Sequence, residues 1–177
     1  MSGPSAASPA WPGEVFAILK GFAVRQVAYV PDAGHAELIR RVHADPQMQP
    51  VPLTTEEEGV ALLCGAWLGG DRGVLLMQSS GVGNCINMLA LAQLCRVPLL
   101  ALVTMRGEWG EFNPWQVPMG TATPDALRLM GMRVLRAERA AEIVETVQAG
   151  AALAFDGAAP TAVLFAQRAL GAKDFRK

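Results

Sequence analysis

Short runs of consecutive apolar residues alternate along the chain with longer segments in which apolar residues recur at helical spacing. The apolar runs predict strands at residues 26–30, 51–53, 74–77, 97–103, 133–135 and 161–165. The helical segments are residues 11–22, 36–43, 56–68, 123–130 and 138–155, and a further one that follows a Ser/Gly stretch and ends near Cys95. Strands that are apolar throughout are typical of a parallel sheet with helices on both faces. We therefore predict a single α/β domain over residues 14–170, a flexible lead-in at 1–13 and a tail at 171–177.

Three acidic residues begin a predicted helix that is otherwise apolar on every side. Glu56, Glu57 and Glu58 precede an uncharged segment that continues to Gly70. A helix without a polar face is buried, so its first turn brings a carboxylate to the edge of a dry interior, where a charge needs a partner. Thr55 followed by Glu58 also fits a capping box, which is a purely structural role. Three acids exceed what a cap requires.

The carboxyl ends of parallel strands share one edge of the sheet, where ligands bind in folds of this class. The candidate residues at this edge are Asp32 and His35 after the first strand, Gln78, Ser80, Gly81, Gly83 and Asn84 after the third, and Arg106 and Gln116 after the fourth. Glycines let a backbone approach a ligand closely, and helix N-termini attract anions, but a tight strand-to-helix turn explains the same pattern. Asp32 alternatively caps the following helix. The predicted loop at 104–120 fits either an anionic substrate or a partner subunit.

The composition narrows the classes of function. Apolar residues make up 51% of the chain and charged residues 18%, which leaves room for a large partner interface. The net charge of −1 argues against nucleic acid as a partner, and no apolar stretch is long enough to span a membrane. The N-terminus lacks the pattern of a signal peptide, and Cys64, Cys85 and Cys95 have no metal-ligand spacing. We expect a cytoplasmic protein without a metal site of its own.

Four segments in one order carry a family resemblance. They are residues 57–68, the stretch Gln78-Ser79-Ser80-Gly81-Val82-Gly83-Asn84 with the apolar residues before it, Pro98-Leu99-Leu100, and the segment from Arg106 to Gln116-Val117-Pro118-Met119-Gly120. Together they resemble the pyrimidine-binding domain of thiamine-diphosphate-dependent 2-oxo acid decarboxylases, in particular the enzymes that act on sulfopyruvate and phosphonopyruvate. The resemblance covers roughly residues 14–170 and implies a three-layer α/β/α fold with a mainly parallel sheet.

The resemblance also implies a role for one of the acids. In the family, a glutamate at the start of the buried helix binds the N1′ atom of the aminopyrimidine and favours its imino tautomer, which activates the cofactor. Counting back from Ala66-Trp67 identifies this glutamate as Glu57, with Glu58 as the alternative and Glu56 facing solvent. The resemblance implies cofactor contacts for Gln78, Ser80, Gly81, Gly83 and Asn84, and substrate contacts for Asp32, His35, Arg106 and Gln116.

A missing motif implies a second subunit. The family's metal- and diphosphate-binding domain carries a Gly-Asp-Gly segment with a downstream Asn, and this sequence has no Gly-Asp-Gly. We therefore expect a β subunit to hold magnesium and the diphosphate, in an α2β2 or larger assembly. The expected reaction is decarboxylation of a small anionic 2-oxo acid, foremost sulfopyruvate to sulfoacetaldehyde and carbon dioxide. The alternatives are a phosphonopyruvate decarboxylase subunit, and a catalytically inactive binding or regulatory module.

Overall fold

The computed structural model describes residues 10–171 and contains one parallel six-stranded sheet in that range. Its strands lie in the order β2-β1-β3-β4-β6-β5, and every neighbouring pair is parallel. Their bounds are β1 Val24–Tyr29, β2 Gln49–Pro52, β3 Arg72–Gln78, β4 Leu100–Thr104, β5 Arg133–Ala137 and β6 Thr161–Phe165. β3, β4 and β6 are buried over almost their whole length, which is why they read as continuous apolar runs.

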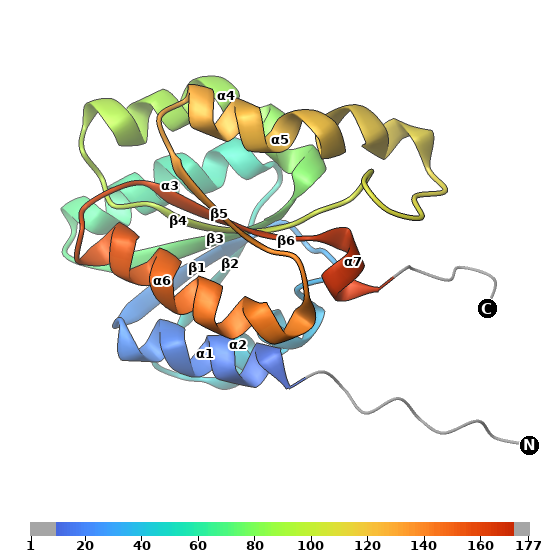
Figure 1. Ribbon diagram of the computed structural model, residues 1–177. Helices are drawn as coiled ribbons and strands as arrows, with labels where there is room; N and C mark the ends of the chain where they lie inside the picture. Colours follow the sequence, from blue (N-terminus) through green and yellow to red (C-terminus); the bar gives the residue numbers. More distant parts are fainter. Residues whose placement is uncertain (1–9, 172–177) are drawn as a thin grey trace, which may run out of the picture.

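Helices cover both faces of the sheet, so the domain has the three layers that the sequence predicted (Figure 1). One face is covered by α1 (Trp11–Gly21), α2 (Ala36–Ala44) and α6 (Ile143–Phe155), and the other by α3 (Glu56–Leu68), α4 (Ser79–Leu94) and α5 (Val117–Leu129). Short helices follow three strands: η1 (Pro114–Gln116), η2 (Ala140–Glu142) and α7 (Gln167–Leu170). Within residues 10–171, no helix has the length and apolar character needed to cross a membrane.

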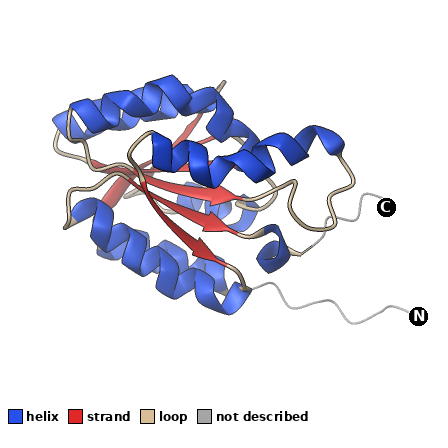
Figure 2. Cartoon of the chain, turned by 45° about the horizontal axis from the view of Figure 1, so that its top comes forward, coloured by secondary structure: helices blue, strands red, loops and turns tan. Residues whose placement is uncertain are grey.

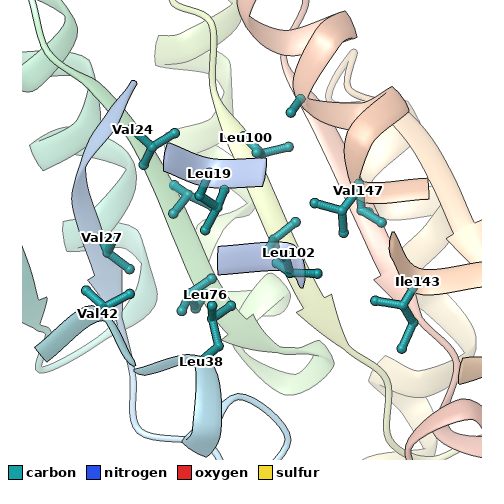
Figure 3. Packing of buried hydrophobic residues seen from close by; sticks show 14 of the residues in the cluster. Leu19, Val24, Val27, Leu38, Val42, Leu76, Leu100, Leu102, Ile143 and Val147 are labelled. Carbon is teal, nitrogen blue, oxygen red and sulfur yellow. The ribbon is translucent and has the colours of Figure 1, made fainter. Parts of the chain in front are cut away.

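Two apolar clusters fill the space between the layers. The first lies under α1, α2 and α6, and Figure 3 shows part of it, including Leu19, Leu76 and Leu102. The second lies between the sheet and α3, α4 and α5. Burying a leucine or valine side chain is worth about 1.5–3 kcal/mol, so these two clusters supply the main stabilisation of the domain.

The structure corrects the end of the lead-in and the starts of two helices, and it adds one short helix. The expected lead-in at 1–13 is too long, because α1 begins at Trp11 and buries that indole; residues 1–9 lie outside the described range, as do residues 172–177 of the expected tail. The Ser/Gly stretch is not a loop but the first turns of α4. α5 begins at Val117 rather than near residue 123, with Pro124 inside the helix. α7 was not predicted, since four residues are too few to show a period.

The carboxyl ends of the strands gather the candidate residues at one edge. In Figure 2 the strand arrows point toward the edge that carries the long segment after β4. Asp32 and His35 follow β1, Gln78 ends β3, and Arg106 and Gln116 follow β4, whereas Ser80, Gly81, Gly83 and Asn84 lie at the start of α4, which begins directly after β3. α3 begins at the same edge, because it follows β2 directly.

Candidate functional site

Asp32 joins the carboxyl ends of three strands. Its Oδ1 accepts a hydrogen bond from Gln78 Nε2 at 3.1 Å, and its Oδ2 accepts from the Thr104 hydroxyl at 2.7 Å and from the Gly34 backbone N–H at 2.9 Å. The Ser80 hydroxyl donates to Gln78 Oε1 at 2.9 Å. The structure therefore brings together three residues that the sequence proposed, Asp32, Gln78 and Ser80, and adds Thr104. Asp32 does not cap α2, because the cap position is His35.

Glu56 is the buried acid of the first turn of α3. It is 8% exposed, and its Oε2 accepts a hydrogen bond from Asn84 Nδ2 at 2.8 Å. The expectation that Glu56 faces solvent is therefore wrong. The cause is the phase of the helix: α3 is apolar all round, so the pattern of its residues did not show which of three consecutive acids points inward.

Glu57 and Glu58 are less buried than Glu56 and have different hydrogen-bond partners. Glu57 is half-buried and accepts a short hydrogen bond from the Thr55 hydroxyl, and this bond lowers the pKa of Glu57 below its usual value. Glu58 is exposed and accepts from the Thr54 backbone N–H at 3.0 Å. Glu58 thus helps to cap α3, but the Thr55 side chain does not close the predicted capping box. The Glu57 side chain therefore presents a charged, half-buried carboxylate at the edge of the sheet.

The glycines at the start of α4 permit close packing. A Cβ on Gly81 would collide with the carboxylate of Glu56, and one on Gly83 would lie 3.2 Å from the sulfur of Met119. Gly81 is buried, whereas Gly83 and Asn84 are exposed. Packing within the chain therefore explains why residue 81 is a glycine. The backbone at Gly83 is exposed and open to a ligand or a partner.

Ser79 is a site residue that the sequence analysis missed. Its hydroxyl accepts a hydrogen bond from the Arg106 backbone N–H at 3.0 Å, and its carbonyl accepts from the Thr123 hydroxyl at 3.2 Å. Ser79 is completely buried. It connects the first turn of α4 to the segment after β4 and to α5. No local pattern separated it from Ser80, because both serines belong to the first turn of α4.

Arg106 forms a buried ion pair instead of facing an open site. Its Nε and Nη2 each donate to Glu111 at 2.6 Å, and the two side chains are 11% and 4% exposed. Glu111 also accepts from Gln167 Nε2 at 3.0 Å. Arg106 lowers the pKa of Glu111 to about 2. Arg106 is therefore already paired within the chain, and its contact with the substrate stays a prediction.

The segment after β4 is tied down at a second point. Glu108 accepts two hydrogen bonds from Arg136, at 2.7 and 2.9 Å, and the backbone N–H groups of Glu108 and Trp109 both donate to Gln167 Oε1. This anchoring leaves three aromatic side chains on the outside: Trp109, Phe112 and Trp115 are 51%, 63% and 81% exposed.

His35 lies inside the domain rather than at its surface. The side chain is completely buried, its Nε2 lies 3.1 Å from the Leu102 carbonyl, and its ring packs edge-on against Phe165. In the described part of the chain, Nδ1 has no hydrogen-bond partner. Burial lowers the pKa of His35 below 6.5. The structure thus contradicts the expectation that His35 contacts the substrate.

The remaining candidate, Gln116, is the last residue of η1. Its side chain is partly buried, and its Oε1 has no hydrogen-bond partner among the described residues. A pocket of about 180 Å³ opens at the carboxyl edge and is lined by Asp32, Thr104, Arg106 and Gln167 among others. Gln116 is not part of this lining, so its contact with substrate stays a prediction. Over residues 10–171, no three His, Cys, Asp or Glu side chains gather closely enough to hold a metal ion.

Comparisons with known proteins agree with this geometry. Residues 14–113 match the family described as thiamine pyrophosphate enzyme, N-terminal TPP binding domain; thiamine pyrophosphate is another name for thiamine diphosphate. The chain is 38% identical over 134 residues to the sulfopyruvate decarboxylase subunit alpha of Methanothermobacter thermautotrophicus, covering 75% of this chain and 81% of that protein. It is 40% identical over 121 residues to the phosphonopyruvate decarboxylase of Streptomyces viridochromogenes, covering 67% of this chain and 30% of that protein.

A solved structure supports the fold independently. The 2-oxoglutarate:ferredoxin oxidoreductase from Magnetococcus marinus superposes with a TM-score of 0.70 and 17% identity, covering 96% of this chain and 32% of the other. At this identity the likeness concerns the fold alone. The family match and the relatives together show that the chain belongs to the thiamine pyrophosphate enzymes, as their N-terminal TPP binding domain, in the group that includes the alpha subunits of sulfopyruvate decarboxylase.

Proposed function

We propose that this chain is the α subunit of a thiamine-diphosphate-dependent decarboxylase that converts sulfopyruvate to sulfoacetaldehyde and carbon dioxide. The observation that carries the proposal is the position of Glu57. In a chain of this family, Glu57 is an ionised, half-buried carboxylate in the first turn of α3, and its neighbour Glu56 contacts the glycine-rich start of α4.

The residues at this edge fit the pyrimidine end of the cofactor. A ring nitrogen that must gain a proton needs a carboxylate that is ionised at neutral pH, and the lowered pKa of Glu57 meets this requirement. The exposed backbone at Gly83 lets a flat ring approach closely. When bound, thiamine diphosphate supplies the nucleophilic carbon and the electron sink for loss of carbon dioxide from a 2-oxo acid.

The work of this chain is then to bind, orient and hold a proton. Glu57 holds the proton at the ring nitrogen, so its negative charge sets the protonation state of the bound ring. Gln78 donates a hydrogen bond to Asp32 and accepts one from the Ser80 hydroxyl, and this chain of contacts keeps the edge of the site in one arrangement. Glu58 is the alternative acid, but its carboxylate is exposed and bonded to the Thr54 backbone, so we keep Glu57 in the role.

We further propose that the enzyme needs a β subunit, which supplies magnesium and the diphosphate site in an α2β2 or larger assembly. Two surfaces support a partner. After Glu58, neither α3 nor α4 contains a charged residue. The two helices nevertheless expose the apolar side chains of Trp67, Leu68, Leu91 and Leu94. The anchored segment after β4 exposes three aromatic side chains, of the type found at energetic centres of interfaces. The three unpaired cysteines favour a cytoplasmic location.

Phosphonopyruvate is the second candidate substrate, because a phosphonopyruvate decarboxylase shares 40% identity with this chain. Three alpha subunits of sulfopyruvate decarboxylase match this chain over most of their length, and they favour sulfopyruvate. This chain accounts for 81% of a separate alpha subunit of sulfopyruvate decarboxylase, but for only 30% of the phosphonopyruvate enzyme. A chain that spans one third of a longer enzyme matches a domain of it, whereas this chain matches nearly a whole subunit.

A substrate panel tests the assignment. The chain is co-expressed with its β partner, and release of carbon dioxide is measured with sulfopyruvate, phosphonopyruvate and pyruvate at equal concentrations. We expect the highest kcat/KM with sulfopyruvate. A higher value with phosphonopyruvate would move the assignment to that substrate. No release from any of the three, in a complex that assembles, would favour a catalytically inactive binding or regulatory module.

A further inference from the structure

Glu56 occupies a position that the proposed mechanism does not use. Its carboxylate is buried at the contact between the first turn of α3 and the first turn of α4. In the described part of the chain, no Lys, Arg or His side chain forms an ion pair with it, and its one hydrogen bond comes from Asn84 Nδ2. A buried acid with a single neutral donor is an expensive arrangement, and such arrangements are kept where they hold something in place.

The opposing surface of α4 is shaped to receive this carboxylate. Gly81 leaves room for it, because a Cβ at that position would collide with the Glu56 Oε1, Cδ and Cγ atoms and force the Glu56 side chain to move. Gly81 lies one turn before Asn84 on the same helix, so the two residues contact the carboxylate together, one through its backbone and one through its amide. The two contacts define both the distance and the rotation of α4 relative to α3.

We propose that Glu56 is a positioning residue, which locks the first turn of α4 against the first turn of α3 and so sets the separation of Glu57 from Gly83 and Ser80. This inference rests on the proposed function only in what the positioned groups bind. Glu57 follows Glu56 directly in the chain, and Gly83 precedes Asn84 directly. We call the contact of Glu56 with Gly81 and Asn84 the clamp. Its residues are therefore direct neighbours in the chain of the proposed cofactor-binding residues on α3 and α4. Burial, followed by the nearby charges of Glu56 and Glu57, raises the pKa of the Cys85 thiol to about 12, which agrees with this close approach of the two turns.

Hydrogen exchange on the full chain without cofactor tests the clamp directly. Glu56→Ala and Asn84→Ala should each speed exchange of the backbone amides in the first two turns of α4 by about tenfold or more, the size of effect expected for a buried hydrogen bond to a charged group. Glu56→Gln retains the shape and an acceptor oxygen, and should have a smaller effect. The matched control is Glu58→Ala, which removes an exposed acid from the same turn and should leave these amides unchanged.

A double variant shows whether Glu56 and Asn84 act through one shared contact or through two independent ones. If Glu56 and Asn84 act on one contact, Glu56→Ala combined with Asn84→Ala should speed exchange no more than either change alone. Additive effects would overturn the proposal, as would a Glu56→Ala chain whose α4 amides exchange like those of Glu58→Ala. If Glu56→Ala does not fold, Glu56→Gln and Asn84→Ala carry the same comparison.

Cofactor affinity shows whether the clamp serves the site. In the complex with β, Glu56→Ala should weaken thiamine diphosphate binding by about tenfold, measured by calorimetry, with little change in the substrate KM. If Glu56→Gln instead abolishes turnover while exchange and cofactor affinity stay at wild-type values, Glu56 is itself the acid that meets the ring, and the proposal is wrong. A wild-type complex that binds no thiamine diphosphate would refute the proposed function, whereas the exchange result would still decide the clamp.

Discussion

Arg106 and Glu111 form a bidentate ion pair, with both N–O distances at 2.6 Å, in the segment that follows β4. Glu111 lies five residues after Arg106, so the pair closes a turn of the chain, and the Glu111 carboxylate also accepts hydrogen bonds from the backbone N–H groups of Gly107 and Asn113. A segment that the sequence describes as a long loop is therefore organised around one carboxylate. Contacts within the chain hold this segment in its shape.

Glu111→Gln should destabilise the domain at neutral pH by about 2–3 kcal/mol, because it leaves the Arg106 guanidinium buried without its counter-charge. The pKa of Glu111 is lowered from 4.5 to about 2. Its stabilising contribution is therefore complete above about pH 4.5 and is lost as the pH falls toward 2. Urea unfolding at pH 7 and at pH 3 measures both effects.

The difference in unfolding free energy between these two pH values should be smaller in Glu111→Gln than in the wild type. The control is Glu145→Gln, which changes an exposed acid of α6 that forms no ion pair in the described part of the chain. If Glu145→Gln and Glu111→Gln have equal effects, the ion pair does not organise the segment.

His35 should make the domain less stable in mild acid. Burial lowers its pKa in the folded state, whereas the unfolded chain titrates near 6.5. The unfolded state therefore binds the extra proton first, so this contribution is present above about pH 6.5 and is lost as the pH falls below it, by up to about 1.4 kcal/mol per pH unit. His35→Gln retains an N–H donor for the Leu102 carbonyl and should flatten the loss of stability between pH 7 and pH 5.5. If His43→Gln, which changes the other histidine of the chain, flattens it instead, the assignment to His35 is wrong.

Glu57→Gln should lower kcat of the assembled enzyme by about a hundredfold or more, because the amide keeps the shape of the side chain and removes the charge that supports ring protonation. The melting temperature should change little, since Glu57 is only half-buried. Glu58→Gln is the matched control in the same turn. A large loss of kcat in Glu58→Gln, with a mild effect of Glu57→Gln, would move the catalytic role by one residue.

Trp115→Ala should weaken association with β without destabilising this chain. Trp115 is 81% exposed, so it does not cover the core of this chain. Truncating an aromatic residue at the centre of an interface costs about 2 kcal/mol or more of binding free energy. Sedimentation of mixed subunits measures the association, and thermal melts of this chain alone measure its stability. Trp11→Ala, at a buried tryptophan, should show the reverse pattern; normal assembly of Trp115→Ala would refute the interface role.

The order of elements was predictable from the sequence because it shows both continuous apolar runs, which predict strands, and apolar residues at helical spacing, which predict helices. The strands β3, β4 and β6 are buried on both faces, so they appear as uninterrupted apolar runs. The start of α5 was not predictable, because Pro118 and Pro124 both suggest a break, while only Pro124 falls inside the helix beyond its first turn. The start of α4 was misread as a loop because its glycines serve packing against Glu56 rather than a turn.

The site was predictable in its location but not in its internal contacts. Strand ends placed Asp32, Gln78 and Ser80 at one edge, and the structure joins them by hydrogen bonds. Which acid of α3 points inward depends on helix phase, and a helix that is apolar all round gives no phase. The pairing of Arg106 with Glu111, and the burial of His35, depend on the path of the chain after a strand end, which no local period encodes.

The most direct test of the central claim is reconstitution of activity from separate subunits. Purified α, purified β and their mixture are each given sulfopyruvate, thiamine diphosphate and magnesium, and release of carbon dioxide is measured. We expect no release from either subunit alone and turnover in the mixture, with loss of that turnover when α carries Glu57→Gln. Full activity of the purified α chain by itself, or a mixture that assembles and binds thiamine diphosphate but releases no carbon dioxide from sulfopyruvate, would contradict the account.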